Sequence, residues 1–400
     1  MILSIYQKKK LILAIILFSL GSHTITSNAQ IIGGGGSSLL PAVQAIGNSP
    51  AYGAATVIDA NSNLSDLFSS ISGNANLSAA ATETLPILTG GSAMAVGNSL
   101  SNMNNIIQSR LSQTNFADDV NKASVDKRFW VQPFRGWTKQ GNVGPVQGYK
   151  TDNAGVLVGM DRNVKDNLRL GFAVGYSKSN VGANPATARH HMDVATHQLI
   201  GYGGYKVNNN TEVTFQIDGG YNNTKGRRSI SSQSTTALSD FDSYNGHAGV
   251  GIAKNIKLNN KFSLTPSAKA DYTYIQEKSY NETGASLLNL LVKKNSRQEL
   301  LTSANTRLDY SINKASKLFV NAGIAYDAIN DRAKVTSAFS GASGSNFNTN
   351  GLKQKPWIGR AGLGVKYTPK TGLDIYGSYD AELRNKYSNQ TLSAVLRIKF

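Results

Sequence analysis

Three histidines are the side chains in this sequence best spaced to bind a metal ion. His190, His191 and His197 lie close together along the chain, which contains no Cys. A metal site would need a further ligand and a fixed geometry. These histidines instead fall in a polar connection and at the start of an expected strand, where solvated side chains are the usual outcome. We therefore expect no metal and no other cofactor.

A serine lies in a short block that contains glycine. Residues 97–100, Gly-Asn-Ser-Leu, resemble the nucleophile block of serine esterases, with Ser99 as the nucleophile. Asn98 stands where that block has an acidic residue, and no Asp-x-x-His partner follows. A serine nucleophile needs a base and an orienting acid. We therefore expect that the chain is not an enzyme.

The end of the chain shows which elements the sequence builds instead. Apolar side chains occupy every second position there, at Leu392, Ala394, Leu396, Ile398 and Phe400. Arg397 and Lys399 lie between them, and this period of two predicts a strand with one apolar and one polar face. A chain that stops on an aromatic side chain suits a strand that faces lipid better than one at the edge of a soluble sheet.

Segments of the same kind recur from residue 128 onward. In one of them Leu170, Phe172 and Val174 face away from Arg169, as the period of two requires. Twelve such segments are expected at 128–138, 154–164, 168–178, 194–207, 211–224, 241–256, 262–277, 298–312, 317–328, 356–368, 373–385 and 390–400.

The connections between these segments alternate in length. Short turns are expected near Asp166, Asn209, Asn260, Ala315 and Thr371. Long polar connections are expected at 139–153, 179–193, 225–240, 278–297 and 329–355. Aromatic residues such as Trp130 and Trp137 collect near segment ends, as in interface girdles. Together these features favour a twelve-stranded antiparallel outer-membrane β-barrel over residues 128–400, and not a soluble sandwich.

A helical pattern precedes the barrel. Residues 94–117 contain apolar residues at helical spacing. One face of the predicted helix is made of Val96, Leu100, Met103, Ile107 and Leu111. A helix over 94–116 would be about 35 Å long, close to the height of a bilayer with its interfaces. Its other faces are too polar for lipid, so we expect a helix inside the lumen.

The first residues are typical of an export signal. Lys8, Lys9 and Lys10 precede an apolar stretch at 11–20, and small residues at 27–29 predict cleavage before Gln30. Residues 1–29 are therefore interpreted as a signal peptide. Residues 30–93 are rich in Gly, Ser and Ala, and we expect a passenger-like or flexible segment, at most weakly helical.

The net charge of +17 raises the question of an anionic partner. The basic residues are scattered singly and form no stripe, which argues against nucleic acid. We expect a monomer in contact with outer-membrane lipid. Lumen-facing cations at Arg169, Arg360, Lys366, Arg397 and Lys399 would make the pore anion-preferring once the helix is absent.

A lumen helix followed by twelve strands resembles the translocator domain of the autotransporters of type V secretion. The resemblance covers residues from about 80 to 400. It is most specific at 128–134 (Arg-Phe-Trp-Val-Gln-Pro-Phe), 264–266 (Leu-Thr-Pro), 271–272, 282–285 and 396–400.

This resemblance implies a route of assembly. The Sec translocon would export the chain, periplasmic chaperones would hold it, and the barrel-assembly machinery would read the terminal signal that ends at Phe400. The upstream segment would then pass through the lumen to the surface of a Gram-negative cell while the helix plugs the pore. The alternative is a passive, porin-like channel plugged by its helix, with adhesion through the loops at 278–297 and 329–355.

The resemblance also implies a candidate cleavage site. One autotransporter subgroup cuts its pore helix between two asparagines by side-chain cyclisation, driven by acidic residues in the lumen. Asn104 and Asn105 match that pair here, and Asp218, Asp374, Asp380 and Glu382 are the acidic candidates. Because Asn pairs are common in this chain, the match alone is only a hypothesis.

Overall fold

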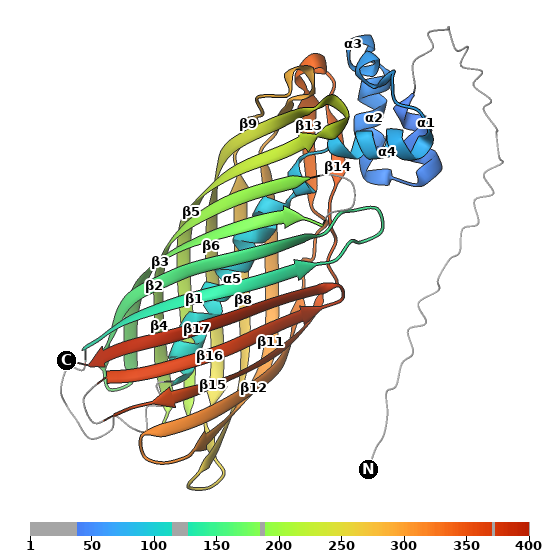
Figure 1. The fold of residues 1–400 in the computed structure, drawn as a ribbon. Helices are drawn as coiled ribbons and strands as arrows, with labels where there is room; N and C mark the ends of the chain where they lie inside the picture. The colour runs from blue at the N-terminus through green and yellow to red at the C-terminus, as the bar shows by residue number, and fades with distance from the viewer. Residues whose placement is uncertain (1–37, 114–126, 185–188, 370–372, 400) are drawn as a thin grey trace, which may run out of the picture. The chain divides into compact units, whose positions relative to one another are not determined.

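Twelve long antiparallel strands close into a barrel in the computed structural model of the protein (Figure 1). The structure describes residues 38–113, 127–184, 189–369 and 373–399. The predicted signal peptide and Phe400 lie outside the described residues, as do residues 30–37 and 114–117. The strands are β1 (Lys127–Gln140), β2 (Tyr149–Lys165), β3 (Leu168–Ala183), β4 (His190–Asn208), β5 (Thr211–Ile230), β6 (Thr235–Lys254), β8 (Phe262–Glu277), β11 (Asn295–Ser311), β12 (Ser316–Asp327), β15 (Trp357–Tyr367), β16 (Leu373–Arg384) and β17 (Tyr387–Lys399).

The seam of the barrel joins the first strand to the last. β1 pairs antiparallel with β17 from Arg128 opposite Lys399 to Gln140 opposite Tyr387. β8 and β11 pair directly, so the loops between them do not interrupt the wall. Closure pairs the edge strands and leaves no open edge of N–H and C=O groups, which a sheet in lipid cannot tolerate. The predicted twelve-stranded barrel is confirmed.

Side chains along most of the strands alternate between lumen and exterior. Phe172 and Val174 are more than half exposed, whereas Ala173 between them is fully buried. The alternation settles the orientation of β1, where Phe129 and Trp137 point outward and Trp130 and Phe134 point inward. The interpretation of Trp130 as a girdle residue was therefore wrong, because its position in the register directs the indole into the lumen.

The strands extend further than expected at the end with the long connections. Residues 225–240, expected as a loop, belong mostly to a hairpin of β5 and β6 that is turned by three residues of 3-10 helix, Ser231–Gln233. A second sheet lies beyond the barrel wall in the order β14 (Phe347–Asn350), β13 (Lys334–Phe339), β10 (Leu290–Val292) and β9 (Tyr280–Asn281).

Helix α5 (Gly91–Gln113) runs along the inside of the barrel (Figure 1). It begins three residues before the predicted start at residue 94. Its polar faces keep it from resembling a lipid-facing helix, and no described helix is long and apolar enough to span a membrane. The lumen helix predicted from the spacing of apolar residues is therefore present.

Residues 39–89 form a helical cap, which we define as α1 (Leu39–Ile46), α2 (Tyr52–Asp59), α3 (Ser62–Ser65) and α4 (Asn74–Glu83) with their connections. The expectation of a flexible segment is wrong for this part of the chain. Leu39, Ile58 and Phe68 are fully buried and share one apolar cluster with Leu288 and Phe339. The cluster forms because loop residues far along the chain complete the core, which a local pattern cannot reveal.

Candidate functional site

The apolar face of α5 packs against one side of the barrel wall. All five residues predicted for that face are buried, with exposures of at most 1%. Val96 and Leu100 share an apolar cluster with Tyr149 and Val194. Met103, Ile107 and Leu111 belong to a second cluster that contains Trp130, Phe134, Leu157, Ala173, Ile200 and Tyr202. The helix therefore packs on the inward-facing aromatic residues of β1 and β4.

Two glycines of the wall allow the helix to approach closely. A Cβ atom added at Gly136 would lie 2.5 Å from Asn102 Nδ2, and one at Gly175 would lie 3.1 Å from Met103 Sδ. Real side-chain carbons do not come as close as the first distance. The glycines of β1 and β3 therefore leave room for the side chains of α5 that lie against the wall.

Polar residues of α5 fix its register against β17. Asn102 Oδ1 accepts hydrogen bonds from Asn389 Nδ2 and Thr391 Oγ1, both at 2.8 Å. One turn earlier, Tyr387 Oη donates to Asn98 Oδ1 at 2.8 Å. Because Asn102, Asn389 and Thr391 are buried, loss of the Asn102 amide would leave unsatisfied polar groups.

Ser99 meets only neutral groups. Its Oγ lies 3.0 Å from Ser179 Oγ and accepts a hydrogen bond from Asn153 Nδ2 at 3.0 Å. Neither partner is a base that could activate a serine nucleophile. The contacts instead attach the helix to β2 and β3.

A buried ion pair lies near the C-terminal end of α5, and sequence analysis did not identify it. Arg110 Nε donates to Asp161 Oδ2 at 2.8 Å, and Tyr202 Oη donates to the same oxygen at 3.0 Å. The Arg110 guanidinium stacks over the Trp130 ring at 4.5 Å. The one signal of this ion pair in the sequence is a single cation beside the apolar face of the predicted lumen helix. Its partner cannot be identified from the sequence because it is distant along the chain.

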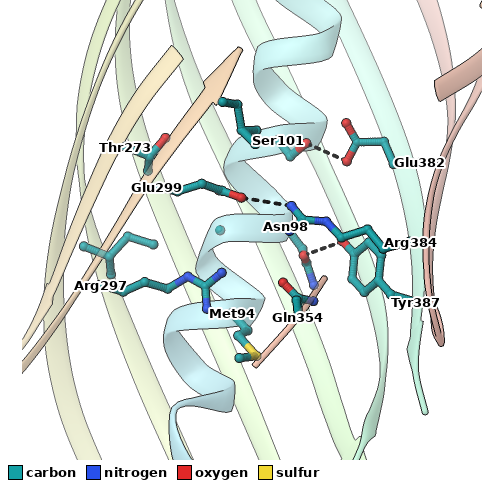
Figure 2. A pocket seen from close by; sticks show the side chains of 13 residues that line it. Met94, Asn98, Ser101, Thr273, Arg297, Glu299, Gln354, Glu382, Arg384 and Tyr387 are labelled. Atoms are coloured by element: carbon teal, nitrogen blue, oxygen red, sulfur yellow. Dashed lines mark hydrogen bonds and ion pairs between the residues drawn. The ribbon is translucent and has the colours of Figure 1, made fainter. Parts of the chain in front are cut away.

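The opposite side of α5 faces a polar cavity of about 210 Å³, lined by β6, β8, β11, β15 and β16. Figure 2 shows a smaller pocket that shares several lining residues with this cavity. In it Ser101 Oγ donates to Glu382 at 3.1 Å, and Arg384 pairs with Glu299 at 2.9 Å. The helix therefore lies off centre, with an apolar surface of the wall on one side and a charged, polar part of the wall on the other.

The two asparagines of the candidate cleavage site point to different partners. Asn104 Oδ1 accepts from Gln216 Nε2 at 2.7 Å, and Gln216 Nε2 also donates to Asp218 at 2.8 Å. Asn105 Nδ2 lies 3.5 Å from Glu382 Oε1. Of the other acidic candidates, Asp380 accepts a hydrogen bond from Asn321, and Asp374 pairs with Arg397. The structure thus brings Glu382 to the pair directly and Asp218 through a glutamine, within a continuous helix.

The cations of the lumen wall face carboxylates. Arg169 lies 3.5 Å from Glu212, Arg360 lies 2.9 Å from Glu382, and Arg397 pairs with Asp374. The side chain of Lys399 lies outside the described residues. The premise behind the expected anion preference, an excess of uncompensated lumen cations, therefore does not hold for these arginines.

The histidine group does not converge. His190 is buried, with its Nδ1 accepting from Leu88 N at 3.3 Å, whereas the His197 ring packs 5.0 Å from that of Tyr176. His191 lies beside Asp193 at 3.7 Å. Among the described residues no group of His, Cys, Asp and Glu is arranged to hold a metal ion.

Of the five residues predicted as an assembly signal, the four that the structure describes lie on the outer face of β17. Leu392, Leu396 and Ile398 are each more than half exposed, and Ala394 is exposed between them. They alternate with the buried Ser393, Val395 and Arg397. The apolar face of this strand therefore points to the exterior, where the other strands present theirs.

Comparisons with known proteins agree with this architecture. The family model "Autotransporter beta-domain" matches residues 129–380. Outer membrane protein A of Rickettsia conorii is 27% identical over 294 residues, which cover 69% of this chain and 14% of that protein. Outer membrane protein B of Rickettsia rickettsii is 23% identical over 286 residues, covering 68% of this chain and 17% of that protein. The chain thus spans a small fraction of the length of these relatives.

A solved structure shows the same fold. The translocator domain of the autotransporter NalP from Neisseria meningitidis aligns with a TM-score of 0.60 and 15% identity, covering 76% of this chain and 98% of that one. The family match spans more than half of the chain, and the relatives are named as outer-membrane proteins. The chain therefore belongs to the autotransporter family, and its barrel is an outer-membrane beta-domain.

Proposed function

We propose that this barrel carries its own N-terminal segment across the outer membrane and then retains the helical cap, folded, at the cell surface. The barrel catalyses no reaction in this proposal. The Sec translocon, periplasmic chaperones and the barrel-assembly machinery deliver and insert it. The observation that carries the proposal is the anchoring of the cap to the end of the barrel that bears the long connections.

The anchor is built around Arg228 of β5. The Arg228 guanidinium and the Glu282 carboxylate form an ion pair with both side chains fully buried. Arg228 also donates to the carbonyl oxygens of Glu83, at 2.8 Å, and Leu288, at 2.9 Å. One side chain therefore ties together the end of α4, a barrel strand and a long connection.

Additional hydrogen bonds satisfy the buried carboxylates around this anchor. Glu282 Oε2 accepts from Leu290 N at 2.9 Å, and the Glu83 carboxylate accepts from Ser232 N at 3.0 Å. A buried charge pair is stabilising only when such additional hydrogen bonds satisfy it. Together with the apolar cluster around Phe68 and Phe339, these contacts hold the cap in one position.

The lumen supports the transport step. α5 connects the cap to β1 and fills part of the pore, so in this proposal the segment before it passes through the lumen. Folding of the cap beyond the pore and packing of α5 within it then oppose backward movement. Both events are driven by burial of apolar surface, and the outer membrane needs to supply no nucleotide.

An epitope inserted between Ser72 and Gly73 tests the location of the cap. Both residues are exposed, and Gly73 has a positive φ of 85° in a turn, so an insertion there leaves the core intact. Protease added to intact cells should remove this epitope. The same epitope at Asn313, in a short turn at the other end of the barrel, should survive until the outer membrane is opened.

Protection of the Ser72 epitope in intact cells would support the alternative, a passive channel whose upstream segment stays inside as a plug. The polar cavity beside α5 is the observation that favours this second candidate. A steady conductance of the intact chain in planar bilayers, together with a protected epitope, would establish it.

A further inference from the structure

The outer surface of the barrel carries a group of cations at the end with the short turns, which is the periplasmic end in barrels of this kind. We call this group the basic collar and define it as Arg162, Lys165, Lys254, Lys257, Lys261 and Lys314. All six side chains are exposed. They come from the ends of β2 and β6 and from the connections that follow β6 and β11, and these two connections are neighbours because β8 pairs with β11.

The collar begins where the lipid-facing surface ends. Along β6, Val250 and Ile252 point outward with about half of each side chain exposed, and Lys254 follows on the same face. Arg162 likewise extends the outward face of β2 and pairs in register with the exposed Leu170 of β3. The first cations therefore lie at the depth of lipid headgroups.

Apolar side chains are interleaved with the cations of the collar. Val164 precedes Lys165, Ile256 and Leu258 flank Lys257, and each of these apolar side chains is more than a third exposed. Phe262 follows Lys261, with its ring 4.9 Å from that of Tyr310. This mixture of apolar and cationic side chains is unusual on a protein surface that faces only water. It is typical of segments that lie in a membrane interface, with apolar groups in the acyl region and cations at the headgroups.

The charge of the collar is not cancelled by the ion pairs of this end, which lie inside the barrel. Those pairs are Arg110–Asp161, Arg169–Glu212 and Arg397–Asp374. Asp166 is exposed beside Lys165 and offsets one charge. The ammonium groups of Lys254, Lys257, Lys261 and Lys314 have no carboxylate partner among the described residues.

We propose that the basic collar binds anionic phospholipid headgroups of the leaflet on the periplasmic side of the outer membrane. The collar has the charge, depth and amphipathic composition that such headgroups recognise. It lies on the exterior of the barrel, so the inference does not depend on what the lumen transports. Anionic lipid at this site fixes the depth and tilt of the barrel in the membrane.

Lipid retention by the purified, folded full-length protein tests the proposal. The protein is incorporated into bilayers of phosphatidylcholine and phosphatidylglycerol, extracted in mild detergent, and its retained lipid is quantified by mass spectrometry. The wild type should retain phosphatidylglycerol in excess of the input ratio. K254Q/K257Q/K261Q should lower that enrichment by at least about tenfold, since each interfacial cation contributes a several-fold preference for anionic lipid and the three preferences multiply.

The matched control is K139Q/K150Q/K353Q, which removes exposed lysines at the opposite end of the barrel. Its enrichment should equal that of the wild type, and higher salt should weaken retention by both proteins. A second variant, K165Q/K314Q, covers the case in which the triple variant does not refold to a heat-modifiable barrel. Absence of enrichment in the wild type, or an equal loss in the control, would overturn the proposal.

Discussion

At the residue scale, two buried arginines connect parts of the protein that are distant in sequence. Arg228 joins the cap to a barrel strand and a long connection, and Arg110 joins α5 to β2 and β4. An apolar side chain in the place of either arginine would leave the groups that accept its hydrogen bonds without a donor. Removing either one leaves a carboxylate buried without its partner, which costs about 3–5 kcal/mol.

R228M should release the cap while leaving the barrel folded. The substitution leaves Glu282 and the carbonyl oxygens of Glu83 and Leu288 without a donor. We expect faster proteolysis in the exposed turn at residues 69–73, measured on the purified protein, with unchanged heat-modifiable migration of the barrel. R227M, which changes the exposed neighbour, should digest at the wild-type rate, and equal digestion of R228M would contradict the anchoring role.

R110M should weaken the packing of the C-terminal part of α5 against the barrel wall. Trp130 loses the cation above its ring, and Asp161 loses its charged partner. In a W137F/W357F background, Trp130 is the remaining tryptophan, and its fluorescence should shift and become more accessible to quencher. R135M, which changes an exposed arginine of β1, serves as the control, and an identical spectrum for R110M would contradict the assignment.

The sequence alone could not predict these two ion pairs. Arg110 and Asp161 are 51 positions apart, and Arg228 and Glu282 are 54 positions apart. Their proximity depends on the register of strands that a local pattern does not fix. The inward direction of Trp130 was missed for the same reason.

At the scale of elements, strands and the lumen helix were the features that the sequence could predict. Each strand has one lipid-facing and one lumen-facing side, so its period is visible without knowledge of its neighbours. The same holds for α5, whose five predicted apolar residues are all buried. The helical cap was not predictable, since its short helices complete their core with side chains of the long connections.

Removal of residues 38–113 should open the lumen without giving it strong ion selectivity. The remaining barrel retains the Arg169–Glu212, Arg360–Glu382 and Arg397–Asp374 pairs, so opposite charges line its wall. We expect a conductance well above that of the intact chain and a reversal potential near zero in a salt gradient. A strongly anion-selective current would contradict this, provided that heat-modifiability shows a folded barrel.

The candidate cleavage at Asn104 and Asn105 belongs to the same scale, because it would divide α5. The helix is packed on both sides of this pair, and Asn102 is anchored to β17 immediately before it. We expect the two residues to remain joined, as seen in an intact mass of the protein from outer membranes. A fragment that begins at Asn105, lost in N104D and retained in N102D, would establish self-cleavage instead.

At the scale of the whole molecule, we expect insertion to depend on the residues predicted as an assembly signal. β17 presents Leu392, Ala394, Leu396 and Ile398 to the exterior and pairs with both β16 and β1. Deletion of Phe400 should reduce the amount of barrel in the outer membrane while any inserted barrel remains heat-modifiable. Equal abundance of the deletion variant and the wild type in membrane fractions would contradict the role of Phe400, and a lysine-to-glutamine change at Lys386 is a suitable control.

The seam between β1 and β17 also has a kinetic consequence. Its partners are the first and last strands of the barrel, so this contact has the greatest loop-closure entropy to overcome and forms late. Until it forms, the growing sheet is a trough with an open side. Because α5 directly precedes β1 in the chain, the helix can be laid into this trough and then enclosed, and the 23-residue element never has to be threaded through a finished ring.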